Sequence, residues 1–501
     1  MSTAPLQRDR QGWARLAAEL RPEGRAFIDG KLVPARSGEL FDDVSPIDGR
    51  VICRIARGAA ADVDAAVAAA RRAFEAGTWR GLPPAERRRI MLRFAELIRA
   101  DVERLALLET LDVGKPIANS VSVDAANCAS CIAYYAELAD KLYDQVAPTG
   151  SSDVALILRE PLGVVGAIVP WNYPLIISAW KLGPALVTGN SVVLKPAEQS
   201  PLSAIRLGEL ACEAGIPPGV LNVVPGLGEE AGKALALHRD VDIVSFTGST
   251  EVGRLMLRYA GESNLKRVAL ELGGKTPHVV LADADLRSAA EGIAWGIYYN
   301  SGETCHAGSR VLVHESVKEA LIEEVRRIAR TITLGHPLDP ATQMGALIDR
   351  AHMQRVLGYI ASGVEAGARI VEGGAQTLQE TGGFYVQATV LDDVRADMQV
   401  AREEIFGPVL AMLAVPDETE AVRLANDSDY GLAAAVWTAD MNVAHRVSRA
   451  LRGGSVWVNC FDRSSMATPF GGFKHSGFGR DRSPHAIDKY TDLKTIWTAY
   501  R

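Results

Sequence analysis

The segment that decides the fold reads Val164-Val165-Gly166-Ala167-Ile168-Val169, six residues without a polar side chain. Such a run is typical of a strand that is buried on both faces, as the strands of parallel sheets are. Predicted helices and strands alternate after it, which implies an α/β fold with a parallel sheet and crossover helices. The predicted helices are residues 176–187, 200–215 and 229–237, and the predicted strands are residues 192–195, 220–224 and 241–247.

A second α/β region is expected further along the chain. Ser316-Val317-Lys318-Glu319 predicts a capping box that opens a helix to about residue 332. In the first region, Ser200 before Pro201 likewise predicts a capped helix start. Leu272-Gly273-Gly274-Lys275 predicts a flexible joint between the two regions. The other predicted elements are short strands within residues 26–56, helices at 62–74 and 84–108, and strands at 311–313, 410–415, 433–437 and 456–459.

Two predicted strands, residues 153–160 and 492–498, stand apart from this alternation. They could pair with each other as a protruding arm, whose exposed edges would join subunits. They could equally form a hairpin that lies on its own domain. The residues alone leave both arrangements open.

Composition limits the class of protein. The 501 residues suit two to four domains, and a net charge of −7 argues against nucleic acid or an anionic membrane as a main partner. Residues 1–19 contain no apolar signal segment and no long apolar run follows, so we expect a cytoplasmic protein without a membrane span. Six cysteines do not form a disulfide framework. Cys128 and Cys131 form a C-x-x-C motif, but no second Cys/His pair has zinc-ligand spacing, so no metal is expected.

Cys305 is the candidate nucleophile. It lies within residues 300–310, between an aromatic-rich segment and a predicted strand. A thiol on a loop between packed elements is held in place and can be approached. Its thiolate would be the reactive species, with a pKa that depends on its surroundings. An inert buried cysteine is the alternative.

Two further side chains suit chemistry at a strand end. Glu271 ends an apolar predicted strand, where burial would raise the pKa of its carboxyl group and suit a general base. Asn172 follows strand 164–169 in a turn bounded by prolines and could donate to an oxyanion. A salt-bridged acid and an asparagine that satisfies its own turn are the alternatives.

Glycine-containing loops suggest a dinucleotide site. Gly248 and Gly253 lie between a predicted strand and a predicted helix, whose free N–H groups would bind phosphate. Gly226 and Gly228 fit a looser dinucleotide pattern, but two acids follow them. Glu198 lies just past a strand, where a carboxylate accepts hydrogen bonds from a ribose 2′-hydroxyl and repels a 2′-phosphate. A tight turn and a solvated loop charge are the alternatives.

Six motifs together resemble the aldehyde dehydrogenase superfamily, in its order and at its spacing, from about residue 25 to 498. Six ordered motifs over nearly the whole chain are specific, and they favour the functional interpretation of the residues above. The motifs are Pro170-Trp171-Asn172-Tyr173-Pro174, Gly248-Ser249-Thr250-Glu251-Val252-Gly253, Glu271-Leu272-Gly273-Gly274-Lys275, the Cys305 loop, Glu404-Ile405-Phe406-Gly407-Pro408 and Pro469-Phe470-Gly471-Gly472.

The resemblance implies a role for each matching residue. Cys305 resembles the family nucleophile and Glu271 the general base. Asn172, together with the Cys305 backbone N–H, resembles the oxyanion site, and Lys181 resembles a lysine near the catalytic glutamate. Glu198 would favour NAD over NADP. The implied NAD contacts are Val169, Pro170, Trp171, Lys195, Glu198, Gly228, Phe246, Gly248, Ser249, Gly253, Leu272, Glu404 and Phe406.

The resemblance also implies the architecture and the reaction. It implies a Rossmann-type NAD domain of residues 1–142 and 163–273, and an α/β catalytic domain of residues 274–473. Residues 143–162 and 487–501 would form a small β oligomerisation arm, which implies a homodimer or homotetramer. In the implied reaction, Cys305 forms a thiohemiacetal with an aldehyde, NAD takes the hydride, and Glu271 activates water to hydrolyse the thioester.

Within the superfamily, the chain is most similar to the gamma-glutamyl-aminobutyraldehyde and guanidinobutyraldehyde dehydrogenases of polyamine breakdown. The similarity runs through residues 180–184, 260–264 and 455–459. Asp462-Arg463-Ser464-Ser465 departs from the acidic loop usual in these relatives, so a pocket for a cationic tail would lose charge. Asp481 stands where many members have glutamate.

Three other functions are alternatives. A CoA-acylating enzyme would have less need of Glu271, and a non-catalytic binding or structural member would lack a competent Cys305 and Glu271. A cysteine hydrolase would need a histidine partner. His306 is adjacent to Cys305, but we expect no Asn or Asp to be positioned to orient it.

Overall fold

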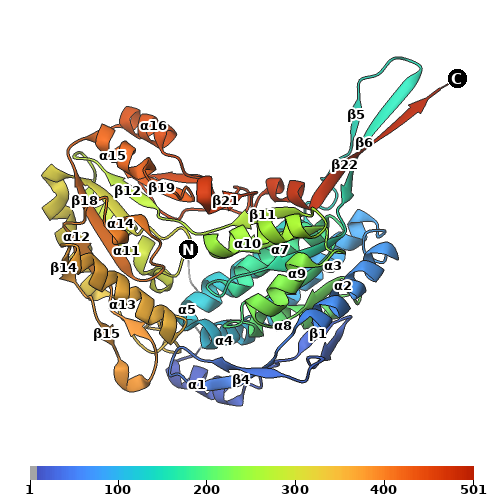
Figure 1. Cartoon of the computed structure of the whole chain (residues 1–501), viewed down its shortest axis with the longest axis horizontal. Helices are drawn as coiled ribbons and strands as arrows, with labels where there is room; N and C mark the ends of the chain where they lie inside the picture. Colours follow the sequence, from blue (N-terminus) through green and yellow to red (C-terminus); the bar gives the residue numbers. More distant parts are fainter. Residues whose placement is uncertain (1–7, 501) are drawn as a thin grey trace.

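The computed structural model describes residues 8–500, which form two lobes and a thin projecting arm (Figure 1). Residues 1–7 and 501 lie outside the described part, so the expectations for the first residues of the NAD domain and the last residue of the arm are not addressed there. Each lobe is built on one large sheet. The division into domains at the expected boundaries stays a prediction.

The first lobe contains the parallel sheet that the sequence predicts. Its five central strands run parallel, and antiparallel strands flank them on both sides. The order across the sheet is β2 (Lys31–Val33), β1 (Ala26–Ile28), β9 (Leu221–Val223), β8 (Ser191–Lys195), β7 (Val164–Ile168), β10 (Ile243–Thr247), β11 (Arg267–Glu271) and β21 (Gly477–Phe478).

Both faces of this sheet are covered by helices, which explains the uninterrupted apolar sequence of β7. Val164 and Ile168 face one helical layer, whereas Val165 and Ala167 face the other. One layer contains α2 (Ala60–Glu75), α9 (Lys233–Leu237) and α10 (Thr250–Glu262). The other contains α3 (Pro84–Ala100), α6 (Ala126–Ala136), α7 (Pro174–Val187) and α8 (Leu202–Glu213).

The strand order places a switch point between β7 and β10. From β7 the chain winds outward through β8 and β9, then returns to β10 on the other side and continues to β11. The segments that leave β7 and β10 therefore diverge and open a crevice at the carboxyl ends of these strands. Open α/β sheets bind ligands in such a crevice.

The second lobe repeats this layered arrangement. Its sheet is parallel except for β14 at one edge. The order is β14 (Arg369–Glu372), β17 (Thr389–Asp392), β18 (Val409–Val415), β13 (Arg310–His314), β12 (Pro277–Val280), β19 (Ala433–Trp437) and β20 (Ser455–Val458). The helices on its faces are α11 (Leu286–Tyr298), α12 (Lys318–Thr331), α13 (Arg350–Glu365), α14 (Gln399–Arg402), α15 (Glu418–Asn426) and α16 (Met441–Ala450).

The two isolated strands pair with each other, as the arm arrangement requires. β6 (Asp153–Pro161) and β22 (Thr491–Ala499) form a nine-residue antiparallel ladder, and β5 (Gln145–Ala147) adds to the other edge of β6. The three strands project from the first lobe (Figure 1). Within residues 8–500, no helix is long and apolar enough to cross a membrane.

Shorter elements complete the described chain. The helices are α1 (Arg10–Glu19), α4 (Val102–Val113) and α5 (Ile117–Asn119), and the strands are β3 (Leu40–Val44), β4 (Val51–Ala56), β15 (Gln376–Thr377) and β16 (Tyr385–Val386).

Two predicted helix caps are wrong. Ser200 makes no cap, and its buried hydroxyl has no hydrogen-bond partner. The carboxylate of Asp112, on α4, instead accepts from the backbone N–H of Leu202 at 3.1 Å. Ser316 lies in a short 3₁₀ turn capped by the side chain of His314, so the predicted capping box does not form. In both places a residue outside the local motif satisfies the free N–H group.

A prediction about helix packing follows from Gly183 in α7. A β-carbon at this position would lie 2.4 Å from the Tyr135 ring of α6. We therefore expect Gly183→Ala to lower the free energy of unfolding by about 1–3 kcal/mol through overpacking. Gly358, in the middle of α13, has open space around it, so Gly358→Ala should stabilise by about 0.5–1 kcal/mol. Thermal unfolding midpoints that shift in the same direction for both variants would contradict this packing.

Candidate active site

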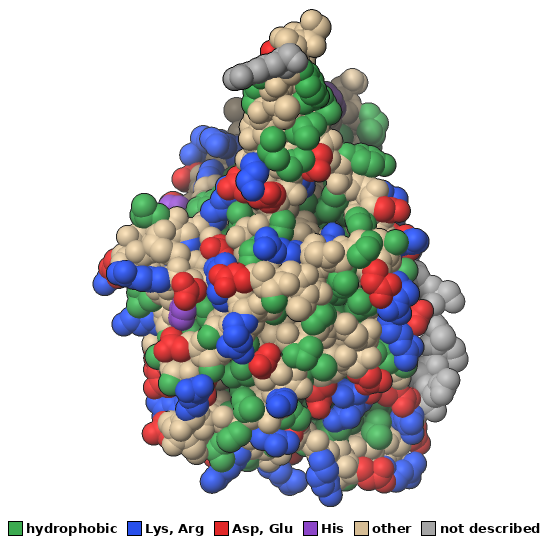
Figure 2. All heavy atoms as spheres, turned by 90° about the vertical axis from the view of Figure 1, so that its right-hand side faces the viewer, with side chains coloured by type: hydrophobic (Ala, Val, Ile, Leu, Met, Phe, Trp, Pro, Cys, Tyr) green, Lys and Arg blue, Asp and Glu red, His purple; other side chains and the backbone are tan. Residues whose placement is uncertain are grey.

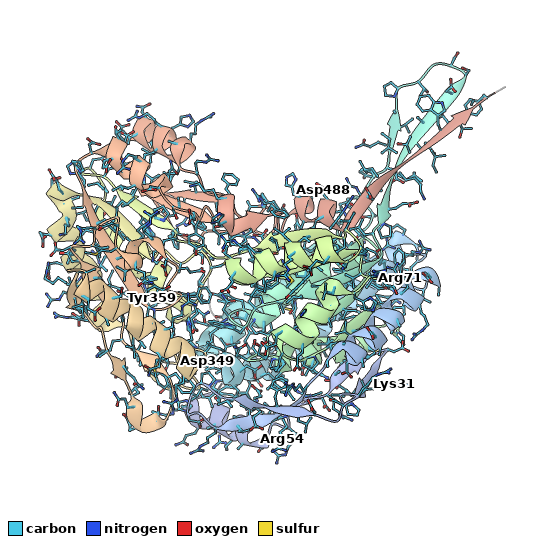
Figure 3. All side chains as sticks on the ribbon, viewed as in Figure 1. Lys31, Arg54, Arg71, Asp349, Tyr359 and Asp488 are labelled. Atoms are coloured by element: carbon cyan, nitrogen blue, oxygen red, sulfur yellow. The ribbon has the colours of Figure 1, made fainter. Side chains whose placement is uncertain are left out.

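One large cavity lies between the two lobes, with a volume of about 640 Å³. The first lobe contributes the segments that follow β7, β10 and β11, and the second lobe contributes loops and the start of α13. Asp349 and Tyr359 line it from the second lobe (Figure 3). The predicted site residues that line it are Pro170, Trp171, Asn172, Gly248, Ser249, Glu271, Leu272, Cys305, Glu404 and Phe406.

Cys305 is half-buried at the wall of this cavity, on a constrained loop. Asn300 and Ser301, which begin the loop, have φ angles of 50° and 54°. Non-glycine residues rarely adopt this left-handed region, and strain of this kind persists only where the surroundings enforce it. Here the Asn300 amide donates to the backbone carbonyl oxygens of Asn172 at 3.3 Å and Glu303 at 3.1 Å.

Asn172 is buried beside Cys305 and points at the same loop. Its side-chain nitrogen donates to the Glu303 carbonyl at 2.8 Å, while its side-chain oxygen has no partner among the described residues. An amide nitrogen carries two hydrogens, so this bond leaves one free to donate. The expected oxyanion role of Asn172 is compatible with this geometry and stays a prediction.

Glu271 ends β11, and only 4% of its surface is exposed. Neither carboxylate oxygen has a hydrogen-bond partner within residues 8–500. Burial first, and then the charge of Asp481, raise the pKa of Glu271 well above its ordinary value. Gly471 leaves room for the group, because a β-carbon there would lie 2.7 Å from a Glu271 oxygen. A carboxyl group with a raised pKa that opens to a cavity suits proton transfer.

Lys181 does not line the cavity but belongs to a buried ion cluster behind Glu271. Its ammonium lies 2.7 Å from Asp481, whose other oxygen bonds Lys489 at 2.5 Å. Burial opposes the charge of Asp481, but the two ammonium groups hold the pKa of its carboxyl group below the ordinary value. Burial lowers the pKa of Lys181, while Asp481 opposes that change. Asp481, which stands where many family members have glutamate, therefore forms ion pairs with two lysines beside Glu271.

The loop after β10 presents a helix N-terminus to the cavity. Ser249 caps α10 by accepting from the Val252 N–H at 3.2 Å, and the first N–H groups of this helix remain free for an anion. Gly248 lines the cavity, as expected. Gly253 does not line the cavity. It makes room for Leu272, because a β-carbon at position 253 would lie 2.7 Å from the Leu272 side chain.

Several other expected cofactor contacts lie outside the cavity lining. Lys195, at the end of β8, is buried and pairs with Glu198 at 3.1 Å. Gln199, the next residue, does line the cavity, so this pair lies near it. The expected contacts at Val169, Gly228 and Phe246 also lie outside the lining. Their cofactor roles stay predictions.

Glu404 and Phe406 enter the cavity from the loop before β18. Glu404 accepts from the Gly274 N–H at 2.9 Å, and desolvation raises the pKa of its carboxyl group to about 7. Phe406 has a φ of 61° and packs edge-on against Trp171 with ring centroids 5.3 Å apart. The carbonyl of Phe406 accepts from His352 at 2.7 Å, which fixes this unfavourable backbone conformation.

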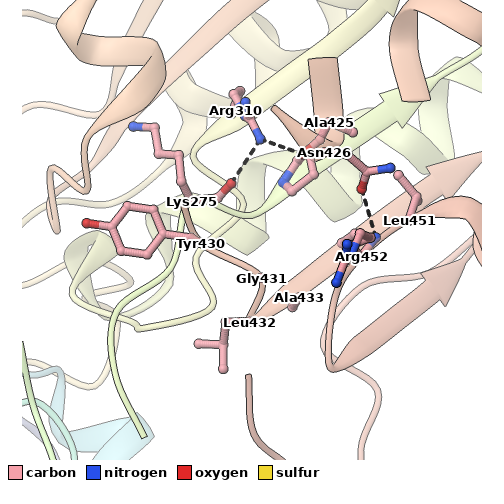
Figure 4. Close-up of a pocket in the computed structure, with 12 residues that line it drawn as sticks. Lys275, Arg310, Ala425, Asn426, Tyr430, Gly431, Leu432, Ala433, Leu451 and Arg452 are labelled. Carbon is pink, nitrogen blue, oxygen red and sulfur yellow. Dashed lines mark hydrogen bonds between the residues drawn. The ribbon is translucent and has the colours of Figure 1, made fainter. Parts of the chain in front are cut away.

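The expected flexible joint at residues 272–275 is wrong. Leu272 and Lys275 are buried, and Gly274 passes so close to the Cys305 carbonyl that a β-carbon would lie 2.6 Å from it. Arg310 donates to the backbone carbonyls of Lys275 at 3.4 Å and Ala425 at 3.1 Å, which fixes the segment from behind (Figure 4). The glycines here permit close packing and do not provide mobility.

The expectation that no acid orients His306 is also wrong. Asp462, on a loop far along the chain, lies with its oxygen 2.9 Å from Nε2 of His306. The other ring nitrogen, Nδ1, lies 3.8 Å from the Cys305 sulfur. In the sequence, Asp462 stands out only as part of the altered loop 462–465, and no spacing rule connects it to residue 306.

The two cysteines of the C-x-x-C motif are buried within α6. All six cysteines are unpaired, and burial raises the pKa of the Cys128 and Cys131 thiols in α6. Within residues 8–500, no group of three His, Cys, Asp or Glu side chains has metal-binding geometry.

A thiol, a buried carboxyl group and a helix N-terminus around one cavity are the features expected of an enzyme that uses a cysteine nucleophile beside an anionic ligand. Residues 32–496 match the Aldehyde dehydrogenase family. The chain belongs to that family, and the expected family and fold are confirmed.

Close relatives span the whole chain. The aldehyde dehydrogenase PuuC of Escherichia coli strain K12, described as NADP/NAD-dependent, is 50% identical over 97% of each chain. The solved structure of an indole-3-acetaldehyde dehydrogenase with NAD⁺ is 55% identical, with a TM-score of 0.97 over 98% of this chain and 100% of that one. The structure of a gamma-glutamyl-gamma-aminobutyraldehyde dehydrogenase from Burkholderia cenocepacia J2315 is 56% identical, with a TM-score of 0.97 over 99% and 100%.

A stability prediction follows from the Asp481 cluster. Asp481→Asn leaves two buried ammonium groups without their counterion, so the free energy of unfolding at pH 7 should fall by about 3–5 kcal/mol. Because the folded-state pKa of Asp481 is lowered, its contribution is present above the ordinary value of about 3.9 and is lost as pH falls further. The deficit of the variant should thus stay constant from pH 8 to pH 5 and narrow only below about pH 4.

Unfolding curves across this pH range measure the effect. Asp492→Asn is the matched control, because Asp492 forms an ion pair of 2.9 Å with Arg267 at the surface, where such pairs contribute little. Equal destabilisation by the two substitutions would contradict the importance of the buried cluster.

Proposed function

We propose that the protein oxidises an aldehyde to a carboxylic acid with NAD, through a covalent intermediate on Cys305. The observation that carries the proposal is that Cys305 and Glu271, from different lobes, line one cavity together with the N-terminus of α10. Membership of the aldehyde dehydrogenase family and the NAD⁺ complex of a relative at 55% identity support it.

The residues present fit a dinucleotide. The cavity combines a helix N-terminus for phosphate with Glu404 and Phe406, and the Gly273 backbone lies so close to Glu404 that a β-carbon would lie 2.0 Å from it. Glu198, near the cavity at the end of β8, would accept from a ribose hydroxyl and disfavour a 2′-phosphate. When bound, NAD would accept a hydride from the aldehyde carbon.

The acylation half-reaction combines Cys305 of the second lobe with Asn172 of the first. The Cys305 thiolate attacks the aldehyde carbon to form a carbon–sulfur bond, and the carbonyl electron pair moves to oxygen. The free Asn172 amide hydrogen and the Cys305 N–H would stabilise this oxyanion. Loss of the hydride then leaves an acyl group on sulfur as a thioester.

The deacylation half-reaction uses Glu271. Once ionised, its unpaired oxygens take a proton from water, which attacks the thioester carbon and displaces the thiolate. The buried Lys181–Asp481–Lys489 cluster lies behind Glu271 and adjusts its proton affinity by charge. A dedicated base of this kind favours hydrolysis of the thioester over transfer to CoA.

Replacement of Glu271 tests this assignment. Glu271→Gln should retain one burst of NADH per active site and then turn over about 10²–10⁴ times more slowly, because water is no longer activated. Rapid-mixing absorbance measures the burst, and intact mass spectrometry should detect the acyl group on Cys305. The control Glu291→Gln removes a surface charge on α11, outside the cavity lining, and should leave deacylation intact. Full steady turnover in Glu271→Gln would contradict the role.

For the substrate, we propose an aminoaldehyde of the kind met in polyamine breakdown. The name of the gamma-glutamyl-gamma-aminobutyraldehyde dehydrogenase at 56% identity supports this class. Arg463 and Ser465 weaken the acidic character of loop 462–465, which favours a tail that is not strongly cationic. Values of kcat/KM for aldehydes with amino, guanidino, acylated-amino, aliphatic and aromatic tails rank these choices.

We also propose that the arm joins subunits into a homodimer or homotetramer and that the protein is cytoplasmic. Six unpaired cysteines suit a reducing compartment. The arm carries exposed apolar side chains on a sheet with free edges, and Figure 2 shows them along the projection. They are Val146, Leu493, Ile496, Trp497 and Tyr500.

A charge on the arm tests the assembly. Leu493 in β22 is 61% exposed, so Leu493→Asp should preserve the fold of each subunit but lower the mass measured by light scattering. The control is the neighbouring Lys494→Gln, which removes only a surface ion pair with Glu160. An unchanged oligomer in Leu493→Asp would exclude this part of the arm from the interface.

A further inference from the structure

His306 forms a continuous hydrogen-bonding line with the nucleophile and an acid. Its Nε2 lies 2.9 Å from the Asp462 carboxylate and its Nδ1 lies 3.8 Å from the Cys305 sulfur. An ionised carboxylate can only accept a hydrogen bond, so Asp462 selects the tautomer with the proton on Nε2. The lone pair of Nδ1 then faces the thiol. This is the arrangement needed to take a proton from sulfur.

The surroundings hold this histidine in place. Its ring packs against those of Trp457, Phe461 and Phe470, with centroids 5.6–6.3 Å away. Trp457 also donates from its indole nitrogen to the Arg463 carbonyl at 2.9 Å, which anchors the loop that carries Asp462. Asp462 itself has a φ of 54°, an uncommon conformation for a residue other than glycine. The loop thus keeps Asp462 in an uncommon backbone conformation, with its carboxylate hydrogen-bonded to His306.

The charges around His306 favour its protonated form. Although burial opposes protonation, the Asp462 charge and the Cys305 sulfur raise the pKa of His306 to about 10. Asp462 is half-exposed, so solvent screens part of this attraction. Although burial opposes it, the charge and hydrogen bond of His306, and then the charge of Arg482, which stacks on Phe470, lower the pKa of the Asp462 carboxyl group. Within residues 8–500, Asp462 and Cys305 are the groups that raise the pKa of the ring.

Glu271 makes no hydrogen bond to the Cys305 thiol. Neither of its carboxylate oxygens has a hydrogen-bond partner within residues 8–500. The Nδ1 atom of His306, by contrast, lies 3.8 Å from the Cys305 sulfur, within hydrogen-bonding distance of a thiol. The geometry therefore makes His306 the adjacent acceptor for the thiol proton.

We propose that His306, oriented by Asp462, is a catalytic residue that accepts the Cys305 proton and keeps the nucleophile as a thiolate paired with an imidazolium. The sulfur–hydrogen bond breaks, the Nδ1–hydrogen bond forms, and the electron pair stays on sulfur. The proton remains on His306 while the thiolate forms and releases the acyl group, and the water proton goes to Glu271. The inference rests on the proposed function only for the use of that thiolate.

The test is the pH dependence of alkylation of the full chain by iodoacetamide, without aldehyde or NAD. Mass spectrometry of the Cys305 peptide separates this reaction from that of the other cysteines. In the wild type, the alkylation rate of Cys305 should stay high down to about pH 6.5. In His306→Asn, the rate should fall by about tenfold or more at pH 6.5 and recover at pH 10, where a thiol ionises without help.

A matched control and a second variant keep the test decisive. His238 forms a similar pair with Asp64 at 3.4 Å on the outside of the first lobe, so His238→Asn should leave the profile unchanged. Asp462→Asn retains the ring and should move the profile in the same direction as His306→Asn, by a smaller amount. Folding of each variant is checked by circular dichroism. If His306→Asn folds and its profile superimposes on that of the wild type, or if Asp462→Asn alone leaves the profile unmoved, the inference is overturned.

Failure of the inference and failure of the proposed function are distinguishable. An unchanged alkylation profile together with aldehyde-dependent NADH production rejects only the role of His306. A shifted profile in a protein that oxidises no aldehyde rejects only the proposed function. If both hold, the NADH burst of His306→Asn should slow near neutral pH and recover in alkali, whereas a ring that only shapes the cavity would slow it equally at every pH.

Discussion

The backbone of Gly274 is fixed between Glu404 and the Cys305 loop, and this contact sets the geometry of the whole site. Its N–H donates to Glu404 and its Cα lies against the Cys305 carbonyl. The segment connects Glu271, at the end of a first-lobe strand, to β12 of the second lobe. Because no side chain separates the backbones, the carboxyl group and the thiol face one cavity. A larger residue at position 274 would clash with the Cys305 carbonyl oxygen, so one of the two backbones would have to shift.

The two lobes contribute to the cavity in different ways. The first sheet offers the carboxyl ends of its strands, at the switch point between β7 and β10, as open α/β sheets do. The second sheet offers the segments that lead into its strands: Cys305 precedes β13, and Glu404 precedes β18. A search for functional residues just after the strands finds Asn172 and Gly248. It would overlook Cys305, the proposed nucleophile, because that residue precedes a strand and is recognised only by its thiol.

Local sequence patterns predicted most of the fold, because burial on both faces of a parallel sheet leaves continuous apolar runs. What they missed depends on contacts between distant residues. Asp112 caps a helix that begins 90 positions later, and Asp462 orients a histidine 156 positions earlier. Glycines 273 and 274 predicted a flexible joint. Glycine permits either backbone freedom or close packing, and which of the two occurs depends on the residues that pack around it. The motifs brought Cys305 and Glu271 together correctly.

The pairing of β6 with β22 also has a consequence for biosynthesis. The ribosome releases β6 hundreds of residues before its partner strand, so the first lobe can fold while one edge of β6 still has unpaired backbone groups. During that interval the nascent chain exposes an unpaired strand edge that can pair with neighbouring polypeptides. In the proposed assembly, the arm can join subunits only after β22 has been synthesised.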